Sequence, residues 1–565
     1  MYWYERRPRR MAHEREVLES LRREGWVKSI EWDIAAKTGT VHADIDFEAG
    51  GELRQARLEY PFIYPSAPPR LLPRIGEQRW SRHQWGTGEL CLQIRADTWL
   101  KSFDGAGVLR SARHLLDTEA TIDEVGRRGE VPSEHRFTEG QLLRWEYARL
   151  VLTDELLAEL QRRGPGVWVL DLRTSSFDQS CVSLGVGISG SPEHARWTDP
   201  AIPSSVGIQK DGVGRIAMVE TGDPRFRALT SRDMPCDERW AAFSSIPFNG
   251  YGVVVGVLDG SVLAKFLGKD NHTHNIIKVL MDKQQRSPAR NAVLAGKRCA
   301  ILGCGSMGSK VATSLARMGI ADFFLVDSDV LKPGNLVRNE LDWAEVGAHK
   351  AEGLAERLKR INAQVKVDGW VNHLGGQTSV ETLMACLTAL KECDLIIETT
   401  GSGQGFVYAS SVSEDKGIPM VWGRVFGGGF GGYIARSRPG IEASALDVRE
   451  NIHQWFHTPG FPDPPPDAGI DYAAGPDDQP PMIADDADVS VISAHLTQFA
   501  ADALRGATGS EYPDSVYVIG LRKEWLFEQP FDVRPIDVSG IRTSSIAEED
   551  EEATADMRHA GESGA

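Results

Sequence analysis

The segment Cys299–Lys350 reads CAILGCGSMGSKVATSLARMGIADFFLVDSDVLKPGNLVRNELDWAEVGAHK, and it decides the fold of the C-terminal part of the chain. An apolar run leads to Gly303, Gly305 and Gly308 in GxGxxG spacing, then to an amphipathic stretch and a second apolar run that ends at Asp327. This order predicts a strand, a glycine turn, a helix and a second strand, as in nucleotide-binding βαβ units. The glycines allow close approach of a phosphate, and the helix N-terminus offers free N–H groups.

The polar residues after the second strand indicate whether the site binds ATP or a nicotinamide dinucleotide. Asp327 stands at its tip, where a carboxylate can accept hydrogen bonds from ribose hydroxyls. Asn335, Arg338 and Lys350 follow shortly after. A nicotinamide site, the usual reading of such a glycine pattern, needs no such cations, whereas an ATP triphosphate does. The residues therefore favour ATP, and an NAD dehydrogenase is the alternative.

The strings GCGSMG, DSD, NLVRN and VGAHK resemble the ThiF family, adenylating enzymes that activate ubiquitin-like proteins and sulfur carriers. The resemblance implies an ATP site built from the glycines, two carboxylates, an amide and two cations: Gly303, Gly305, Gly308, Asp327, Asp329, Asn335, Arg338 and Lys350. It implies that Asp327 binds ribose and that Arg338 and Lys350 bind phosphates, Arg338 being catalytic as well. Asn335 helps to position them.

The resemblance also implies Mg²⁺. In the ThiF family the next strand, predicted here at Leu395–Glu398, leads to an aspartate that holds the metal on the triphosphate. Spacing puts that position at Gly401, which has no side chain for a metal, and Glu398 lies three residues earlier. Because Mg²⁺ takes oxygen ligands, mostly carboxylates and phosphates, Glu398 is the predicted metal ligand. The alternative is weaker catalysis than in the family.

The N-terminal part carries a second pattern. An amphipathic helix precedes strand-like runs at Val27–Trp32, Gly39–Phe47 and Glu52–Tyr60. A proline-rich loop, YPFIYPSAPPR, and the string GELCL around Cys91 follow. Together they resemble the ubiquitin-conjugating (UBC) fold, whose catalytic cysteine lies in such a segment. The resemblance makes Cys91 the acceptor of an acyl group as a thioester, and an accessible thiol has the required nucleophilicity.

The pattern departs from the UBC family in one respect. The usual His-Pro-Asn, whose asparagine helps to hold the oxyanion, is replaced by His83-Gln84-Trp85, which begins closer to the cysteine. His83 or Gln84 could supply that hydrogen bond. The alternative for Cys91 is a small buried thiol.

The middle of the chain contains no motif that identifies a function. Predicted strands lie at Gly166–Asp171, Arg215–Glu220 and Gly252–Asp259. Predicted helices lie at Gln141–Arg163 and Val262–Phe266. We expect an α/β domain here that links the two others.

Residues 457–486 are rich in proline, aspartate and glycine, which predicts an extended loop before a helix. Activating enzymes that form a thioester carry a cysteine in a crossover loop at about this place. Here no cysteine follows Cys393, and Ala473 and Ala474 stand there instead. Either the adenylate passes directly to Cys91, or alanine has replaced a native cysteine.

Composition narrows the protein class. A hydrophobic content of 41% and a charged content of 25% are ordinary for a globular protein, and the net charge of −17 argues against a general nucleic-acid binder. Seven cysteines without a Cys-x-x-Cys pair form neither a disulfide framework nor the zinc site of many ThiF-type proteins. No apolar run has transmembrane length. We expect a cytoplasmic protein with no membrane and no nucleic-acid partner.

These observations predict an α/β and α+β multidomain chain. Its parts are a UBC-like domain (1–140), a linker domain (141–290), a Rossmann-like ThiF adenylation domain (291–546) and a disordered acidic tail (547–565). The arrangement resembles bacterial fusions found with cGAS-like nucleotidyltransferases in antiviral (CBASS) operons.

That resemblance implies a sequence of reactions. ATP would activate a protein C-terminal carboxylate as an acyl adenylate, and the acyl group would pass to Cys91 and then to an amine. It also implies a homodimer and a protein partner, either a cGAS-like nucleotidyltransferase or a ubiquitin-like protein. A sulfur-carrier adenylyltransferase and a non-catalytic scaffold that works without ATP are the alternatives.

Overall fold

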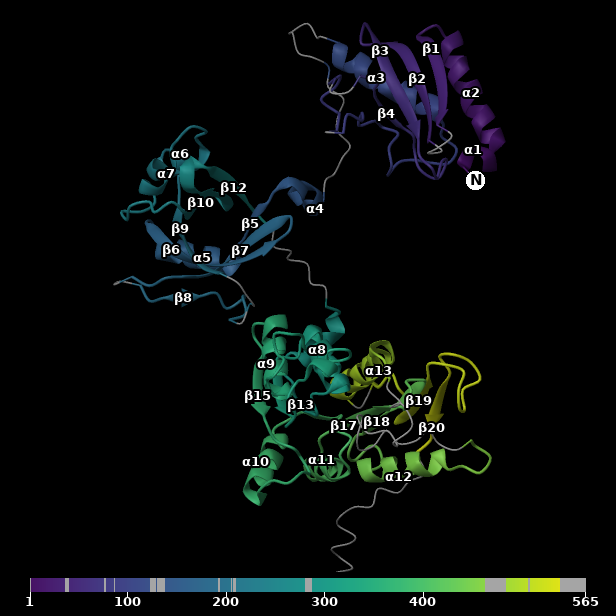
Figure 1. The fold of residues 1–565 in the computed structure, drawn as a ribbon. Helices are drawn as coiled ribbons and strands as arrows, with labels where there is room; N and C mark the ends of the chain where they lie inside the picture. Colours follow the sequence, from purple (N-terminus) through teal and green to yellow (C-terminus); the bar gives the residue numbers. More distant parts are fainter. Residues whose placement is uncertain are drawn as a thin grey trace, which may run out of the picture. The chain divides into compact units, whose positions relative to one another are not determined.

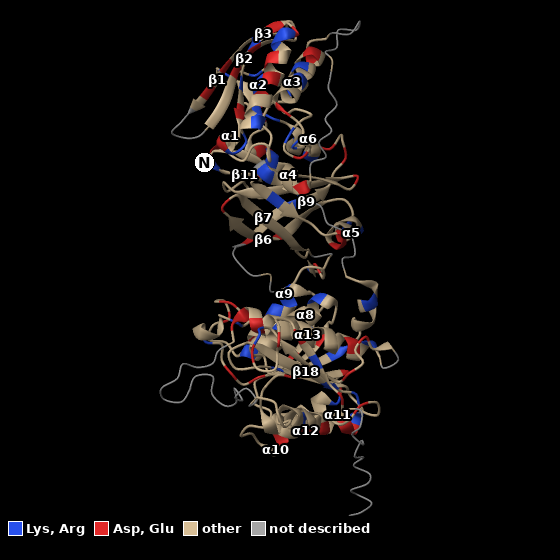
Figure 2. Cartoon of the chain, turned by 90° about the vertical axis from the view of Figure 1, so that its right-hand side faces the viewer, with Lys and Arg blue, Asp and Glu red and all other residues tan. Residues whose placement is uncertain are grey.

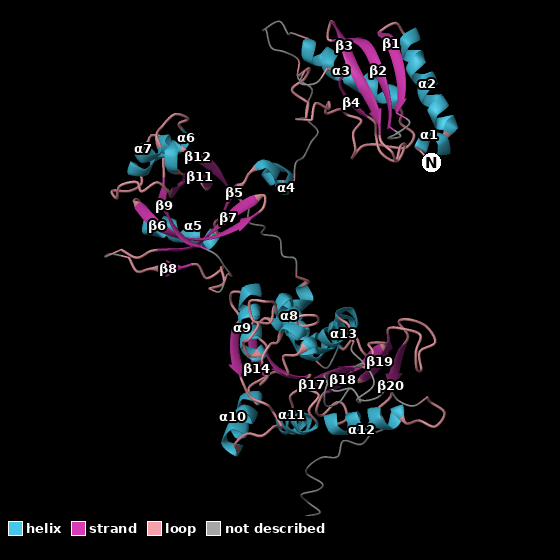
Figure 3. Ribbon diagram, in the orientation of Figure 1, coloured by secondary structure: helices cyan, strands magenta, loops and turns pink. Residues whose placement is uncertain are grey.

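The computed structural model describes residues 2–35, 40–75, 78–85, 87–121, 129, 138–191, 194–204, 206, 210–279, 287–462, 484–506 and 509–538. The chain divides into two compact units, Met1–Thr138 and Glu139–Ala565. The described residues form three sheets, one in the first unit and two in the second (Figures 1 and 3). The predicted tail, Ala473 and Ala474 lie outside the described residues.

The first unit is an antiparallel meander covered by helices. Its strands run in the order β1 (Val27–Ala35), β2 (Thr40–Ala49), β3 (Glu52–Tyr60) and β4 (Arg70–Pro73). The helices are α1 (Trp3–Arg6), α2 (Pro8–Arg23) and α3 (Gly105–Ala120). Alternate residues of β2 are buried, as expected for a sheet with one face in the core. The buried Glu14 carboxylate of α2 accepts hydrogen bonds from the Tyr60 hydroxyl (3.0 Å) and the Gly105 amide (2.8 Å), which ties α2 to β3 and α3.

The second sheet closes on itself. Strand β5 (Ala148–Val151) pairs with both β12 (Thr273–Lys278) and β7 (Ser180–Ile188). The other strands are β6 (Val167–Phe177), β8 (Trp197–Thr198), β9 (Lys210–Met218), β10 (Gly252–Leu258) and β11 (Ser261–Leu267). The accompanying helices are α4 (Glu139–Leu142), α5 (Asp154–Arg163), α6 (Pro224–Thr230) and α7 (Cys236–Ala241). The result is a barrel in the order β5-β12-β11-β10-β9-β6-β7, with β8 added on β7.

Two predictions for this region are wrong. Gln141–Arg163 is not one helix, because β5 interrupts it and α5 begins only after Thr153, whose hydroxyl accepts a hydrogen bond from the Leu156 amide (3.0 Å). Val262–Phe266 is strand, not helix. Asp259 and Gly260 have φ of 46° and 80°, so the chain turns sharply and β11 pairs back on β10.

The third sheet carries the glycine motif. Its order is β15 (Lys366–Trp370), β14 (Asp322–Val326), β13 (Arg298–Leu302), β16 (Leu395–Glu398) and β17 (Met420–Val425), all parallel. Antiparallel β18 (Gly431–Ser437), β19 (Val516–Gly520) and β20 (Val533–Ile536) continue it. The glycine-rich segment between β17 and β18 is a hairpin turn, with Gly428 and Gly429 at positive φ.

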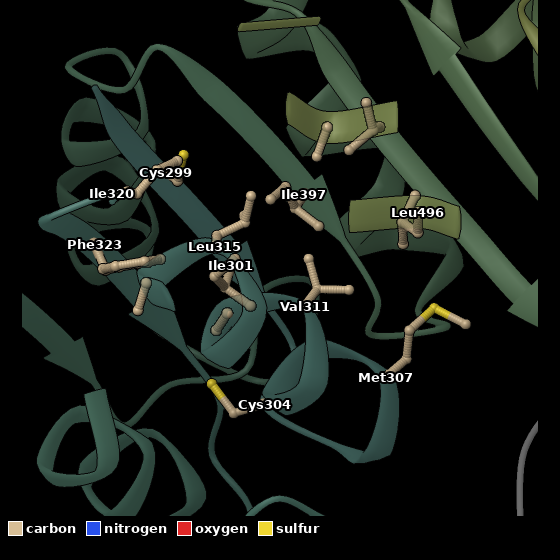
Figure 4. Close-up of a cluster of buried hydrophobic side chains, with 14 of the residues drawn as sticks. Cys299, Ile301, Cys304, Met307, Val311, Leu315, Ile320, Phe323, Ile397 and Leu496 are labelled. Carbon is tan, nitrogen blue, oxygen red and sulfur yellow. The ribbon is translucent and has the colours of Figure 1, made fainter. Parts of the chain in front are cut away.

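Helices cover both faces of this sheet (Figure 1). One face carries α8 (Ser306–Met318), α9 (Lys350–Ile361) and α13 (Asp486–Arg505). The other carries α10 (Val380–Leu390), α11 (Gly403–Lys416) and α12 (Ala445–Phe456). In Figure 4, side chains of β13, α8, β16 and α13 meet in one core, among them Ile301, Val311, Ile397 and Leu496. Strands buried on both faces explain the continuous apolar runs in the sequence.

Charged residues are found in each of the described parts of the chain. Positive and negative positions are interspersed along the helices and strands (Figure 2). Among the described residues, no helix is both long and apolar enough to cross a membrane.

Candidate functional sites

A cavity of about 790 Å³ lies at the carboxyl ends of the parallel strands in the third sheet. Its lining includes nearly all the residues predicted for the nucleotide and metal: Gly303, Gly305, Asp327, Asp329, Asn335, Arg338, Lys350 and Glu398. They converge because β13 is paired with β14 on one side and with β16 on the other. Ligands of open α/β sheets bind where neighbouring connections leave a strand in opposite directions like this.

The glycine turn owes its shape to close packing at two positions. Gly303 has φ of 89°, and a Cβ there would lie 2.9 Å from the carbonyl carbon and oxygen of Thr399. A Cβ on Gly308 would lie 1.9 Å from the Gly303 oxygen. Gly308 therefore holds α8 against the turn and is absent from the cavity lining. An added Cβ on Gly305 would meet nothing within 4 Å, so this residue faces open space.

The Asp327 carboxylate holds the glycine turn after β13 by hydrogen bonds. Its Oδ2 accepts a hydrogen bond from the Cys304 amide (2.6 Å), and its Oδ1 accepts one from the Asp329 amide (2.7 Å). Burial raises the pKa of the Asp327 carboxyl, while those backbone hydrogen bonds and the charge of Lys350 act in the opposite direction. The carboxylate thus joins the glycine turn of β13 to the end of β14, in the cavity wall.

The two predicted phosphate-binding cations come from the segment after β14. The Lys350 ammonium lies 2.7 Å from the Asp329 carboxylate, which lowers the pKa of Asp329. Asn335 accepts a hydrogen bond from the Lys332 amide (2.9 Å) and closes a short turn; its carbonyl then accepts from the Arg338 amide (3.2 Å). Asn335 therefore positions the backbone from which Arg338 projects into the cavity lining.

Glu398 lies at the end of β16 and is 6% exposed. Its Oε1 accepts hydrogen bonds from the Thr400 amide (2.8 Å) and the Thr400 hydroxyl. Burial raises the pKa of this carboxyl, whereas Thr400, Arg449 and Arg424 act to lower it. Gly401 also lines the cavity, with φ of 71° and no side chain.

The site residues fit ATP and a magnesium ion. The glycine turn, the N-terminus of α8, two cations and a carboxylate match the phosphates and ribose. Within the described ranges, no three His, Cys, Asp or Glu side chains converge on a metal position. Mg²⁺ is normally bound through one or two carboxylates plus phosphates and water, so one carboxylate can be enough, and Glu398 stays the predicted ligand.

Sequence reasoning missed several lining residues. Arg424 at the end of β17, Arg449 on α12 and His373 after β15 all line the cavity. No short motif marks them, since each comes from a different segment beyond the glycine turn. The only signal in the sequence is that Arg424 and His373 lie near the carboxyl ends of parallel strands, where ligands bind in such sheets.

The predicted thiol lies in a short hairpin of the first unit. The Cys91 amide donates to the His83 carbonyl (2.7 Å), and the Trp85 amide donates to the Glu89 carbonyl (2.8 Å). Leu90 and Leu92 are buried, whereas Cys91 is partly exposed, as alternation in an extended segment requires. Burial raises the pKa of the Cys91 thiol, and the charge of Arg95 acts to lower it.

The structure separates the two residues considered as oxyanion donors. The Gln84 amide donates to the Gln78 carbonyl (2.9 Å) and the Gly88 carbonyl (2.8 Å), and its oxygen accepts from the Trp80 amide (2.7 Å). Both side-chain amide hydrogens of Gln84 thus hold the loop in this structure, which disfavours Gln84 as the donor to an acyl group on Cys91. His83 lies directly across the hairpin from Cys91, so it remains the candidate oxyanion donor.

Four further cysteines, all in the region of the third sheet, behave as packing residues. Cys299 and Cys304 are fully buried, which raises the pKa of each thiol well above its ordinary value. Burial raises the pKa of Cys386 and of Cys393 to about 11. Thiols of this kind are poor nucleophiles at neutral pH.

Comparison with known proteins identifies the C-terminal region. Residues 282–451 match the model of the ThiF family. This segment is a ThiF domain. It contains the glycine turn, both predicted cations and Glu398.

Known relatives match only part of this chain. The ATP-dependent ubiquitin transferase-like protein Cap2 of Enterobacter hormaechei is 33% identical over 116 residues, 20% of this chain and 18% of that protein. The sulfur carrier protein ThiS adenylyltransferase of Bacillus subtilis is 24% identical over 143 residues, 25% of this chain and 40% of that protein. Three curated relatives, Cap2 among them, are matched over only 18 to 30% of their own length. The crystal structure of E. coli MccB with ATP matches with 15% identity and a TM-score of 0.33, covering 45% of this chain and 67% of that one.

Proposed function

We propose that this chain activates the C-terminal carboxylate of a protein with ATP and passes the acyl group through Cys91 to an amine. The observation that carries the proposal is the cavity in the ThiF domain, where the glycine turn, Asp327, Arg338 and Lys350 line one space. Such a set of groups matches a triphosphate and a ribose better than it matches a dinucleotide.

The first step forms an acyl adenylate. A carboxylate oxygen of the substrate attacks the α-phosphorus of ATP, the bond between the α-phosphorus and the bridging oxygen breaks, and pyrophosphate leaves. Arg338 and Lys350 offset the negative charge along the triphosphate. Mg²⁺, held through Glu398, would neutralise further phosphate charge when bound. Asp327 orients the ribose, and Asn335 orients the segment of Arg338.

The second step moves the acyl group to the first unit. The Cys91 thiolate attacks the acyl carbon, a C–S bond forms and AMP leaves. A substrate amine then attacks the thioester, an amide forms, and the thiol is restored after one proton leaves the amine. Because both sites belong to one chain, the handover benefits from a high effective concentration. The domain scheme of UBC-like, linker and adenylation parts belongs to this proposal.

Similarity to Cap2, an ATP-dependent ubiquitin transferase-like protein, supports a protein as the substrate. We assign the chain to antiphage defence, with a cGAS-like nucleotidyltransferase or a ubiquitin-like protein as the activated substrate and a homodimer as the working form. Conjugation of that substrate would prime it for its own activity.

Intact-mass analysis tests the proposal. The full chain is co-expressed with its neighbouring genes, purified and supplied with ATP and Mg²⁺. A thiol-labile mass adduct that is absent in Cys91→Ala is the expected result, and its mass identifies the carrier. Absence of the adduct, with no pyrophosphate exchange in the presence of the same partners, would overturn the proposal.

Two further variants decide between direct and relayed transfer. Ala473→Cys and Ala474→Cys place a thiol in the predicted crossover loop. Direct transfer predicts that neither variant changes loading of Cys91. Loading that appears only in one of them would mean that alanine has replaced the first acceptor.

One alternative function has an observation in its favour, the similarity to the ThiS adenylyltransferase. A sulfur-carrier activator would exchange pyrophosphate with a small carrier and leave Cys91 unmodified. The same mass experiment separates the two functions, because only the conjugating function puts an adduct on the first unit.

A further inference from the structure

Two arginines in the cavity have no role in the nucleotide site described above. Arg424 lies at the end of β17, and Arg449 projects from α12. Both line the same cavity as the buried Glu398 carboxylate, and their charges partly oppose the rise in its pKa that burial causes. They give the cavity a second pair of cations besides Arg338 and Lys350.

Arg449 is exposed, and a cation–π contact orients its guanidinium. Its Cζ lies 4.6 Å from the centre of the Phe406 ring of α11, within the range of a cation–π contact. A Cβ built on Gly403 would lie 3.9 Å from its Nη2, so the guanidinium also lies over the first turn of α11. Within the described part of the chain Arg449 forms no salt bridge. Its donors are therefore oriented but not consumed by a protein carboxylate.

The strand order separates this pair from the phosphate cations. Arg338 and Lys350 follow β14, which lies on one side of β13, whereas Arg424 ends β17, two strands away on the other side. At the ordinary strand spacing, Arg424 leaves the sheet roughly 10 Å from the glycine turn of β13. With the ribose at Asp327 after β14 and the metal at Glu398 on β16, the nucleotide site takes up the ends of β14, β13 and β16, so the β17 end is the part of the cavity left for a second reactant.

We propose that Arg449 and Arg424 form a carboxylate-binding subsite that takes the C-terminal end of the protein substrate. This inference rests on the proposed adenylation function and names the residues that would bind the carboxylate of the protein substrate. A substrate carboxylate must approach phosphate oxygens of the same sign of charge, so cations at the point of entry favour its binding and its orientation. The carboxylate is either the terminal one or that of an acidic side chain close to it.

Arginine suits this role better than lysine would. Its planar fork can bind a carboxylate through two parallel hydrogen bonds, and stacking on Phe406 leaves the edge of the guanidinium free to do so. Glu398 lies beside the subsite, so a metal-free carboxylate there would repel the substrate. The two arginines offset that repulsion.

Pyrophosphate exchange with peptide pools tests the subsite on the full chain. Three pools of random hexapeptides are compared: free carboxylate without Asp or Glu, the same peptides with a C-terminal amide, and free carboxylate with Asp and Glu allowed. The variants are Arg449→Ala, Arg449→Lys and Arg424→Ala. Arg317→Ala, an exposed arginine on α8 outside the cavity lining, is the matched control. ATP affinity of each variant is measured separately by calorimetry.

We expect exchange with both free-carboxylate pools and none with the amide pool. Arg449→Ala and Arg424→Ala should each raise the half-saturating peptide concentration about tenfold to a hundredfold, the loss of one charge-assisted pair. ATP affinity should stay within twofold, and Arg449→Lys should lie between wild type and Ala. An equal loss with both free-carboxylate pools identifies the terminal carboxylate. A loss confined to the acid-containing pool identifies an acidic side chain.

Three results would overturn the subsite. A tenfold loss of ATP affinity in Arg449→Ala would move the arginine to the triphosphate. Peptide dependence equal to that of Arg317→Ala would make the arginines structural. A wild-type chain that binds ATP but exchanges with no pool would show that the cavity does not capture a peptide carboxylate. Failure of the proposed function differs from all three, because the wild-type chain would then not bind ATP or would not exchange with its co-expressed partner.

Discussion

The nucleotide cavity and the Cys91 hairpin differ in how their chemistry is distributed. The cavity collects side chains from the ends of β13, β14, β16 and β17 and from α12. The hairpin presents one thiol on a residue whose amide donates a hydrogen bond to the His83 carbonyl, and buried leucines flank it. Removal of one side chain from a binding site with many contributors weakens binding in part, whereas removal of a nucleophile abolishes the reaction. Mutations at the two sites should therefore differ in kind as well as in size.

The largest expected effect is at the thiol. Cys91→Ala should abolish the thiol-labile adduct completely, because the alanine side chain has no sulfur atom with which to form a thioester. ATP affinity and the melting temperature should not change, since the side chain is partly exposed and the nucleotide cavity lies in the other unit. Intact-mass analysis and calorimetry check this, with Cys181→Ala, another partly exposed thiol, as the control. An adduct that survives in Cys91→Ala would place the acceptor elsewhere.

The next effect separates graded loss from complete loss. Lys350→Ala or Arg338→Ala should each weaken ATP binding about tenfold to a hundredfold, since each removes one charge-assisted contact worth about 1.5–3 kcal/mol. Calorimetry with ATP measures it, and loading of Cys91 should fall in proportion at limiting ATP. Lys359→Ala, on the same helix as Lys350 but outside the cavity, is the control and should bind ATP as wild type does. Unchanged ATP affinity in both cavity variants would contradict the assignment of the phosphate site.

The two sites also differ in how far the sequence predicts them. Gly303, Asp327 and Lys350 could be assigned because one βαβ unit brings a contiguous segment to one strand edge. Arg449 could not, because its place in the cavity depends on how α12 packs against α11, and no spacing rule reports that. For the hairpin, the motif indicates Cys91, but the occupied amide of Gln84 follows from loop hydrogen bonds that no sequence pattern specifies.

The wrong prediction of a helix at Val262–Phe266 also arises from contacts that the local sequence pattern does not specify. The short apolar run Val262–Phe266 fits either a helix or a strand by periodicity alone. The Asp259-Gly260 turn decides the matter, because both residues adopt positive φ and return the chain onto β10. In the third sheet such ambiguity is absent: Leu395–Glu398 is bounded by clear turn residues, and the predicted strand matches β16.

A smaller effect tests the packing that shapes the cavity. Gly308→Ala would put a Cβ 1.9 Å from the Gly303 oxygen, so the turn or α8 must shift. We expect a loss of about 1–3 kcal/mol in stability and a few-fold weaker ATP binding, measured by thermal unfolding and calorimetry. Gly305→Ala is the matched variant for stability only, because its added Cβ meets no protein atom within 4 Å while the residue itself lines the cavity. Equal losses of stability in the two variants would show that close packing does not distinguish these glycines.

The smallest effect concerns the charges around the thiol. Burial raises the pKa of Cys91, so its thiolate fraction is low at neutral pH and alkylation by iodoacetamide should accelerate as the pH rises toward that pKa. Arg95 lowers this pKa and Glu89 raises it. Removal of the cation in Arg95→Gln should raise the pKa further and slow alkylation at pH 7.5, whereas Glu89→Gln should lower the pKa and speed it. Each change should be about twofold, the size expected for partly solvent-screened charges.

Peptide mapping of the alkylated chain reports Cys91 separately from the partly exposed Cys181, which serves as an internal reference within each sample. Opposite signs for the two variants would mean that local charge sets the thiolate fraction of the hairpin. Changes of the same sign would mean that both substitutions act by loosening the hairpin and exposing the thiol. In that case the reactivity of Cys91 would depend on the loop held by Gln84, and the thiol site, like the nucleotide cavity, would depend on several contributors.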